Sequence, residues 1–449
     1  MKDLTKGNIY KNFILFAIPL VLSGLLTQAF NVINGMLSGK YLGEFGLAAI
    51  GSTTSFSELY GSFFWGWGMG FSIYIAKLFG EKNYSKLRNS IYVSVVALMI
   101  LSVVSSVLLI IFKKPFFTLL NVDEELYQPA SVYFTIIISG YFLISLNTWA
   151  ISIFSSLGIT GYPFAVSLST TIFFTLMKYI ILEYCGGGLA SIAVLSLIAA
   201  LSRNLLYGIK LRECFREMNV SKEKVSLDIG ILKETVGYSL PVVFQQFCIY
   251  FASFFIAPFV NGFGHSATAS YSVILSIQHL STSVYQNSAK TVSSYSAQCL
   301  GAREFNKFKK GVSVGFLQGM AFVLPVIILC SIFADKICGM YFDTSSGQAF
   351  DFAVIFVRYF LPFILFNMIN NLFHAFFRGV AAMKLLVICT LFGAVSRYIA
   401  TILFTPHFDY YGVFIGWVVS WIAEAVFVVI LYYSGVWKKE KVNKLKAEI

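Results

Sequence analysis

One junction occurs twice in this sequence. The segment from Ala76 to Arg88 reads AKLFGEKNYSKLR, and the segment from Ala297 to Lys309 reads AQCLGAREFNKFK. The two segments begin 221 positions apart, and each follows a long apolar stretch. A repeat of this length indicates two homologous halves, each of them a bundle of several helices. We therefore expect the function to lie where the two halves meet.

Long apolar runs recur along the whole chain. Hydrophobic residues make up 57% of the 449 residues and charged residues only 12%, about half the charged fraction of an ordinary soluble domain. About 20 helical residues cross the hydrocarbon core of a membrane, whereas a membrane β-barrel would show short alternating segments. The fold class is therefore an all-α integral membrane protein. Twelve spans are predicted, at 12–38, 46–78, 88–112, 130–157, 162–184, 188–209, 235–261, 267–298, 311–333, 350–377, 385–404 and 411–434.

The two copies have the same orientation in the membrane, because six spans separate them. Parallel repeats are related by a pseudo-two-fold axis along the membrane normal. We predict an N-terminal lobe of six helices at 1–210, a cytoplasmic linker at 211–234, and a C-terminal lobe of six helices at 235–449 that ends in a short basic tail. The linker carries charges of both signs and is predicted to be solvated.

Lysine and arginine are distributed unequally between the two sides of the spans. With a cytoplasmic N-terminus, 22 of them lie on the inner side and 4 on the outer side. The positive-inside rule then places both termini in the cytoplasm of a multi-pass protein of the plasma (inner) membrane. Basic loops that face anionic lipid also account for the net charge of +12 without any nucleic acid.

Motifs of enzymes and cofactor sites are absent from the sequence. No glycine-rich phosphate loop with a lysine occurs, and the seven cysteines are scattered singly, without metal-ligand spacing or a disulfide framework. We predict no enzymatic activity, no cofactor and no metal. The expected partners are small-molecule cargo and membrane lipid, and the expected state is a monomer.

A series of motifs extends over the whole chain: Leu4-Thr5-Lys6-Gly7, Phe16-Ala17-Ile18-Pro19-Leu20, Leu47-Ala48-Ala49-Ile50, the two basic junctions, Ser239-Leu240-Pro241 with Gln245-Gln246, and Phe377-Arg378-Gly379. In their order and spacing these motifs resemble those of the multidrug and toxic compound extrusion (MATE) transporters. The resemblance implies two six-helix lobes in a V, which export organic compounds by alternating access as an antiporter driven by protons or sodium ions. The alternative within transport is a flippase for lipid-linked or polysaccharide-precursor cargo, although such relatives often have extra spans.

The chain departs from the family pattern at two positions. Where members commonly carry an acid in the first span, this chain has Asn34, and the fifth span carries Lys178 where many members have Asn and Asp. Both residues lie in the outer half of their spans, so we expect them to be neighbours. We hypothesise that the Lys178 ammonium, or its deprotonation, replaces a bound external cation. The alternative is a structural ion pair of Lys178 with Glu58.

Further ionisable residues lie within predicted spans, where each needs water, a partner or a function. Arg397 and Glu424 are predicted to pair. Proton coupling through an acid would use Glu58 or Glu424, and His374 is a third candidate because histidine titrates near neutral pH; a structural, hydrogen-bonded role is its alternative. Four more residues near span ends are expected to extend toward the interface, namely Lys77, Arg203, Arg358 and Arg378.

Polar residues at helical spacing in spans seven, eight and ten are candidates for the lining of a substrate cavity. Hydrogen bonding between helices is the alternative explanation. Lysines at 178 and 290 make the interior less negative than a pump for lipophilic cations requires, which favours anionic or zwitterionic cargo. The cavity candidates are Gln245, Gln246, Tyr250, Lys290, Asn367, Asn370 and Asn371.

Overall fold

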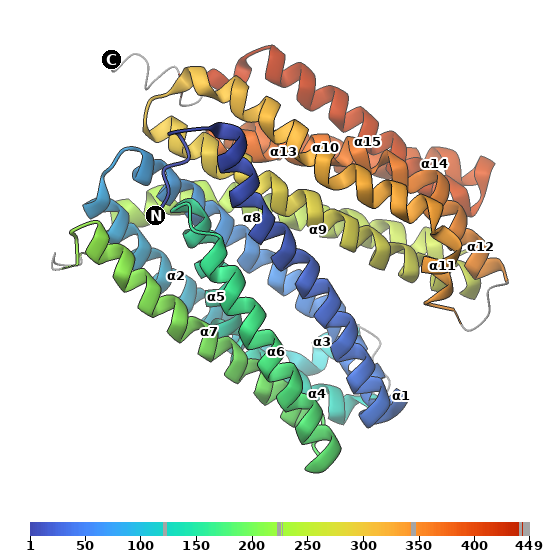
Figure 1. The fold of residues 1–449 in the computed structure, drawn as a ribbon. Coiled ribbons are helices and arrows are strands. Elements are labelled where there is room, and N and C mark those ends of the chain that lie inside the picture. The colour runs from blue at the N-terminus through green and yellow to red at the C-terminus, as the bar shows by residue number, and fades with distance from the viewer. Residues whose placement is uncertain (120–123, 222–225, 227, 343–346, 440–441, 443–449) are drawn as a thin grey trace. The chain divides into compact units, whose positions relative to one another are not determined.

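The structure is a computed structural model that describes residues 1–119, 124–221, 226, 228–342, 347–439 and 442. Within these ranges nearly all residues are helical and no strand occurs (Figure 1). The side chains at the following positions lie outside the description: 32, 44–49, 51–56, 58, 116, 119, 124, 251–255, 257–258, 261 and 265.

Helices follow one another along the chain with short connections. The first half contains α1 (Ile9–Gly80), α2 (Tyr84–Ile111), α3 (Lys113–Leu119), α4 (Glu124–Ser139), α5 (Tyr141–Ser156), α6 (Gly161–Tyr184) and α7 (Leu189–Glu217). The second half contains α8 (Ile229–Asn261), α9 (His265–Gly301), η1 (Phe305–Lys307), α10 (Phe308–Ile332), α11 (Ala334–Gly339), α12 (Gln348–Ile355), η2 (Phe356–Phe360), η3 (Leu361–Phe363), α13 (Ile364–Gly379), α14 (Met383–Phe408), α15 (Tyr410–Tyr433) and η4 (Val436–Lys438).

Each predicted span corresponds to helical structure, but four spans differ in form from the prediction. Spans one and two form the single element α1, which is broken at Gly43, where φ is 67°. Span four consists of α4 and α5, bent by 50°, and span ten is interrupted by a π turn and a 3-10 turn at Pro362. In the described ranges eight helices are long and apolar enough to cross a membrane, or nine with the bent pair.

The duplication is visible in the backbone as well as in the sequence. Lys82 and Arg303, which end the two equivalent helices, both adopt a left-handed conformation, with φ of 56° and 58°. In each copy the amide of this residue donates to the carbonyl three residues earlier, and the next amide donates to the carbonyl five residues earlier. This pattern is a Schellman motif. The repeated junction therefore encodes the same helix end twice.

The chain forms two compact units that exchange a segment. Unit 1 contains Met1–Lys2 and Leu26–Val243, and unit 2 contains Asp3–Leu25 and Phe244–Ile449. The first part of α1 therefore belongs to unit 2, and the first part of α8 belongs to unit 1. The sequence predicted two lobes and a linker but not this reciprocal exchange, because hydropathy identifies a span without showing which bundle it joins.

In unit 1, two glycines allow α1 to approach the first part of α8 closely. A Cβ atom at Gly66 would lie 2.8 Å from the Cα of Val243, and one at Gly70 would lie 2.2 Å from the Cα of Ser239. Small residues four positions apart are the usual means of bringing two membrane helices into backbone contact. This contact holds the start of α8 in unit 1.

The core of unit 2 is rich in aromatic side chains. Phe356 packs edge-to-face against Phe414 and Trp417, with ring centroids 4.8 and 5.7 Å apart. Tyr410 packs 4.9 Å from Phe414. Pairs of this geometry contribute about 0.5–1.5 kcal/mol beyond the area that they bury. They join η2 to α15, next to the helices that carry the candidate site of this unit.

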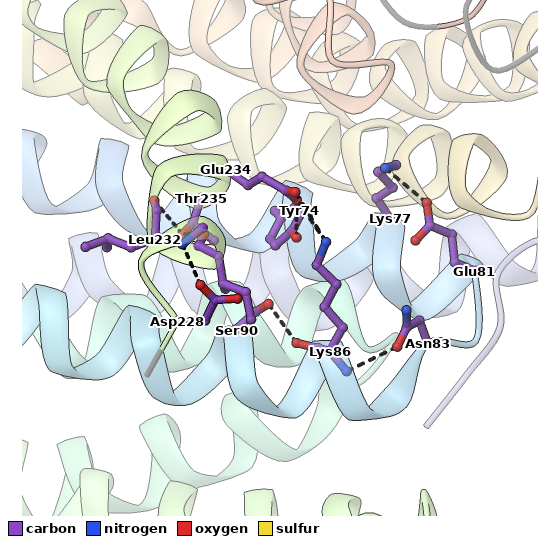
Figure 2. A network of polar contacts seen from close by, with 12 residues as sticks. Tyr74, Lys77, Glu81, Asn83, Lys86, Ser90, Asp228, Leu232, Glu234 and Thr235 are labelled. Atoms are coloured by element: carbon purple, nitrogen blue, oxygen red, sulfur yellow. Dashed lines mark hydrogen bonds and ion pairs between the residues drawn. The ribbon is translucent and has the colours of Figure 1, made fainter. Parts of the chain in front are cut away.

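A polar contact also fixes the first turn of α8 in unit 1. The Glu234 carboxylate accepts hydrogen bonds from the Tyr74 hydroxyl of α1 and from Lys86 Nζ of α2, at 3.2 Å for the lysine (Figure 2). Burial on its own would raise the pKa of Glu234. The hydrogen bonds from Tyr74 and Lys86 outweigh it, so the pKa of this carboxyl lies below its ordinary value.

Replacing Glu234 with glutamine is expected to lower the free energy of unfolding by about 0.5 kcal/mol at pH 7, a small value because the side chain is 51% exposed. Since the pKa is lower in the folded state, the stabilisation is complete above the pKa of the unfolded chain and is lost as the pH falls through the folded pKa. Thermal unfolding in detergent should therefore separate Glu234→Gln from wild type at pH 7 but not at strongly acidic pH.

The control for this prediction is Glu213→Gln, which removes an exposed pair of Glu213 with Lys210 within α7 alone. That variant should unfold as wild type does. Equal destabilisation by both variants would mean that the Glu234 contact has no special role.

Candidate functional site

In unit 1, Lys178 of α6 and Asn34 of α1 are in contact, as predicted. Lys178 Nζ donates a hydrogen bond of 3.3 Å to Asn34 Oδ1, and both side chains are partly buried. An asparagine oxygen can only accept and an ammonium can only donate, so the pair is complementary without any titratable acid. The two residues are far apart in the sequence, and they are in contact because they lie at the same depth in two neighbouring helices.

The same two helices are joined again just before the break of α1 at Gly43, near the end of α6. The Tyr41 hydroxyl of α1 donates to the Glu183 carboxylate of α6, and Lys40 Nζ donates to the Tyr41 oxygen at 3.1 Å. Because both contacts advance in the same direction along α1 and α6, these helices run parallel. Two levels of hydrogen bonding thus fix the position of Lys178 relative to α1.

Among the described side chains, the Lys178 ammonium interacts with a neutral amide and with a second cation. Its hydrogen bond goes to Asn34, and Arg203 of α7 acts on it electrostatically. The predicted ion pair with Glu58 lies outside the described residues, because the Glu58 side chain is not part of the description. A partly buried ammonium in such surroundings can attract an anion or give up its proton.

In unit 2, a chain of polar contacts joins α8, α13 and α15. The Glu424 carboxylate of α15 lies 3.2 Å from His374 Nε2 through Oε1, and its Oε2 accepts a 3.1 Å hydrogen bond from Asn370. The other ring nitrogen of His374 lies 3.1 Å from Gln245 Nε2 of α8. His374 and Asn370 are buried, and the Glu424 side chain is 12% exposed. Nε2 approaches Oε1 obliquely, outside hydrogen-bond geometry, so this contact is defined by distance alone.

Arg378 completes this network, and the prediction for it was wrong. It was expected to extend from a span end toward the interface, but it is only 5% exposed and its Nη1 donates to Gln245 Oε1 at 3.0 Å. A signal for this was present in the sequence: 370, 374 and 378 recur every four residues and share one helix face. The depth of a residue in its span does not show which helix face it shares.

The predicted pair of Arg397 with Glu424 is replaced by other contacts. The Arg397 guanidinium lies 4.5 Å from the Trp417 ring centroid, a cation–π distance, and it also interacts with the Tyr271 phenol. The reason is the register of the antiparallel pair α14 and α15, which lie side by side (Figure 1). Gly393, one turn before Arg397, is level with Glu424.

The predicted stripe of α13 divides into two faces. Asn370 and His374 are buried beside Glu424, whereas Asn371 Nδ2 bonds to the carbonyl and side-chain oxygens of Asn367 at 3.1 and 3.2 Å. These last two residues are partly buried, and their amides are satisfied within their own helix. They remain candidates for a cavity lining.

The remaining cavity candidates lie on α8 and α9. Gln246 and Tyr250 are partly buried on α8, and Lys290 Nζ donates to Asn287 Oδ1 at 2.9 Å on α9. Lys290 also acts electrostatically on Arg378. Unit 2 therefore brings two basic side chains, Lys290 and Arg378, close to each other. Within the described ranges no group of three or more histidine, cysteine, aspartate or glutamate side chains has the geometry to hold a metal ion.

Comparison with known proteins agrees with the duplicated architecture. A family model described as MatE matches the chain twice, at residues 19–180 and 241–403, which together exceed half of its length. The two matches begin 222 positions apart, close to the spacing of the repeated junctions. The predicted duplication is confirmed by this double match.

Two curated relatives and two solved structures cover almost the whole chain. The Probable multidrug resistance proteins YoeA and YpnP of Bacillus subtilis (strain 168) are 23% and 22% identical over 98% of this chain and 97% and 98% of their own lengths. An outward-facing multidrug resistance MATE family transporter of the MOP superfamily superposes with a TM-score of 0.85 at 19% identity, covering 98% of this chain and 99% of its own.

The second structure is a MOP superfamily transporter from Pyrococcus furiosus Vc1. It has a TM-score of 0.89 at 19% identity, with 97% of this chain and 98% of its own covered. It is described as having a binding pocket whose reverse polarity suggests a different function. The fold class predicted from the sequence, a two-lobed bundle of twelve membrane helices, is thereby confirmed.

Proposed function

Because the chain belongs to the MATE family of multi-pass membrane transporters, we propose that it exports small organic compounds as an ion-coupled antiporter. The two units alternate between states open to either side of the membrane, and the cargo and the coupling ion each favour one state. A ligand shifts such an equilibrium only by its difference in affinity for the two states. Residues that bind ion or cargo are therefore expected inside the units, on membrane helices.

The observation that carries the proposal is the presence of ionisable groups inside both units. Lys178 contacts Asn34 in unit 1, and Glu424 contacts His374 and Asn370 in unit 2. An ionisable side chain at the centre of a membrane helix costs at least about 2.5 kcal/mol. Groups of this kind usually mark the paths of ions, protons or substrates.

For unit 2, a proton is a better coupling ion than sodium. Asn370 Nδ2 donates both to the Trp421 carbonyl and to Glu424, so the amide cannot turn its oxygen toward the carboxylate without losing these bonds. His374 presents a ring nitrogen to the other oxygen. A sodium ion prefers a shell of oxygen ligands, as other hard cations do, but the neighbours of this carboxylate are a ring nitrogen and an amide N–H group.

The cargo that fits these units best is anionic or zwitterionic. Basic side chains lie inside both units, among them Lys178 in unit 1 and Lys290 and Arg378 in unit 2, and lipophilic cations would be repelled by them. The transporter from Pyrococcus furiosus, which is described as having a binding pocket of reverse polarity, is an example of this fold with a pocket of different polarity. The same cations favour the second candidate function, a flippase whose lipid-linked cargo carries an anionic headgroup.

We place the protein in the plasma membrane with both termini in the cytoplasm and expect it to act as a monomer. The support is the excess of lysine and arginine in the inner loops.

The test is flux in proteoliposomes that contain only the purified protein. A fluorescent organic anion, zwitterion and cation, and a lipid with an anionic headgroup, are offered under a proton gradient and, separately, a sodium gradient. We expect uphill movement of the anion or zwitterion under the proton gradient. Movement of the cation alone would contradict the cargo assignment, movement of the lipid alone would favour the flippase, and no response to either gradient would refute ion coupling.

A further inference from the structure

Gln245 stands between a guanidinium and an imidazole in unit 2. Its Oε1 accepts from Arg378 Nη1 at 3.0 Å, and its Nε2 lies 3.1 Å from His374 Nδ1. Gln245 is 2% exposed and Arg378 is 5% exposed. Water therefore cannot easily replace either partner, and the orientation of this one amide affects both neighbours.

The orientation of the amide follows from the chemistry of its neighbours. An arginine side chain donates hydrogen bonds and never accepts them, so the Gln245 oxygen must face Arg378. The amino group of Gln245 then faces His374 Nδ1 and donates to it, which requires a lone pair on Nδ1. In a neutral imidazole with an acceptor at Nδ1, the proton resides on Nε2.

The other side of His374 agrees with this assignment. Nε2 lies 3.2 Å from Glu424 Oε1, at an oblique angle, so a proton at Nε2 lies close to a carboxylate oxygen. The second oxygen of Glu424 accepts from Asn370, whose amide is oriented by the Trp421 carbonyl. Glu424 thus has a ring nitrogen near one oxygen and an amide donor at the other.

We infer that Arg378, acting through the Gln245 amide, holds His374 in the Nε2–H tautomer, so that the neutral ring places its N–H group beside Glu424 Oε1. Arg378, Gln245 and His374 are then positioning residues, and Glu424 is the group of this network that takes up and releases a proton. The assignment of the tautomer stands on the contacts alone. The role of Glu424 rests on the proposed ion coupling.

The charged and titratable groups around the network are consistent with this inference. Arg378 interacts electrostatically with Lys290 of α9. Glu424 interacts electrostatically with Tyr285 of α9 and with Cys389 of α14. The phenol and the thiol are ordinarily neutral at pH 7. A second proton on His374 would add a positive charge beside Arg378 and would turn an N–H toward the Gln245 amino group.

Nitrogen-15 NMR of histidine-labelled, full-length protein at pH 7.5 tests the tautomer directly, because the two ring nitrogens have distinct shifts in each protonation state. The chain has 4 histidines, and His374→Gln identifies the signal. We expect an unprotonated Nδ1 and a protonated Nε2. An Nδ1–H tautomer or a doubly protonated ring in wild type would overturn the inference.

Two substitutions test how Arg378 acts. Gln245→Glu places an acceptor opposite Nδ1, so His374 should gain a proton there, whereas Gln246→Glu, a carboxylate one position further along α8, should leave the spectrum unchanged. Arg378→Lys retains a donor-only group and should keep the tautomer, and Arg378→Met should give a mixture. If Gln245→Glu does not fold, the lysine and methionine variants decide alone. Identical spectra for these two would show that Arg378 is not involved.

Flux measured against pH tests the second half of the inference. His374→Gln should reduce the rate several-fold but keep the pH dependence, and Glu424→Gln should abolish the pH dependence. Loss of the pH dependence in both variants, or its retention in Glu424→Gln, would overturn the role of Glu424. A wild-type flux that does not change with pH would refute proton coupling. The NMR result would still decide the tautomer of His374.

Discussion

Replacing Lys178 with alanine is expected to reduce gradient-driven flux by at least about tenfold. Lys178 is the charged member of the polar pair in unit 1, and its hydrogen bond to Asn34 joins α6 to α1. A hydrogen bond that involves a charged group is worth about 1.5–3 kcal/mol, and each ~1.4 kcal/mol corresponds to a factor of ten in rate. Because alanine supplies neither a charge nor a donor, both proposed uses of Lys178, attraction of an anion and release of a proton, are lost.

Two variants control this prediction. Lys178→Arg keeps the positive charge and a donor for Asn34 but cannot release a proton, so it separates anion attraction, which it should preserve, from proton release, which it should abolish. Lys210→Ala removes an exposed lysine of α7 that pairs with Glu213 and should not change the flux. Size-exclusion profiles verify that each variant is folded. Unchanged flux in Lys178→Ala would end the proposed role of this residue.

Replacing Gly70 with valine is expected to have the largest effect on stability, about 3 kcal/mol or more. Its Cβ would lie 2.2 Å from the Cα of Ser239 and 2.8 Å from the Ser239 Cβ. Overpacking costs about 1–3 kcal/mol where side chains can move aside. Here the nearest atom belongs to the backbone of α8, so the helices themselves must separate and the contact of α1 with the start of α8 is lost.

Gly208→Ala is the matched control for the Gly70 prediction. Gly208 also lies within a helix, α7, but nothing lies within 4 Å of a Cβ built on it. Alanine should therefore stabilise the protein by about 0.5–1 kcal/mol through helix propensity. Thermal unfolding in detergent measures both variants. If Gly70→Val unfolds at the wild-type temperature, the close approach of α1 and α8 in unit 1 is disproved.

The predicted spans agree with the helices because the cause of each span is local. A segment of about 20 apolar residues must satisfy its backbone hydrogen bonds internally to enter a membrane, and the helix is the simplest way to do so. The repeated helix ends at Lys82 and Arg303 are equally local, since a Schellman motif involves only six consecutive residues. The break at Gly43 is the exception within α1, where two expected spans share one helical element.

The candidate site was predictable only where two residues share a depth. Asn34 and Lys178 were expected to meet because both lie in the outer half of spans that run in the same direction, and they do meet. Depth was a poor guide for Arg397, which lies one helical turn away from the level of Glu424 and packs on Trp417. A displacement of one turn, about 5.4 Å, is enough to change partners.

By itself, the sequence determined the membrane class, the twelve helices, the duplication and the identity of the polar residues, since these follow from composition and from periodicity along the chain. Only the tertiary structure decided that the first part of α1 belongs to unit 2 and the first part of α8 to unit 1. It also decided that Arg378 and His374, rather than Arg397, belong to the network of Glu424. The physical reason is that helix register and rotation depend on close packing between distant segments. Gly66 and Gly70 lie against α8 and Gly393 lies against Glu424, with no room for a side chain, and hydropathy and spacing cannot specify such contacts.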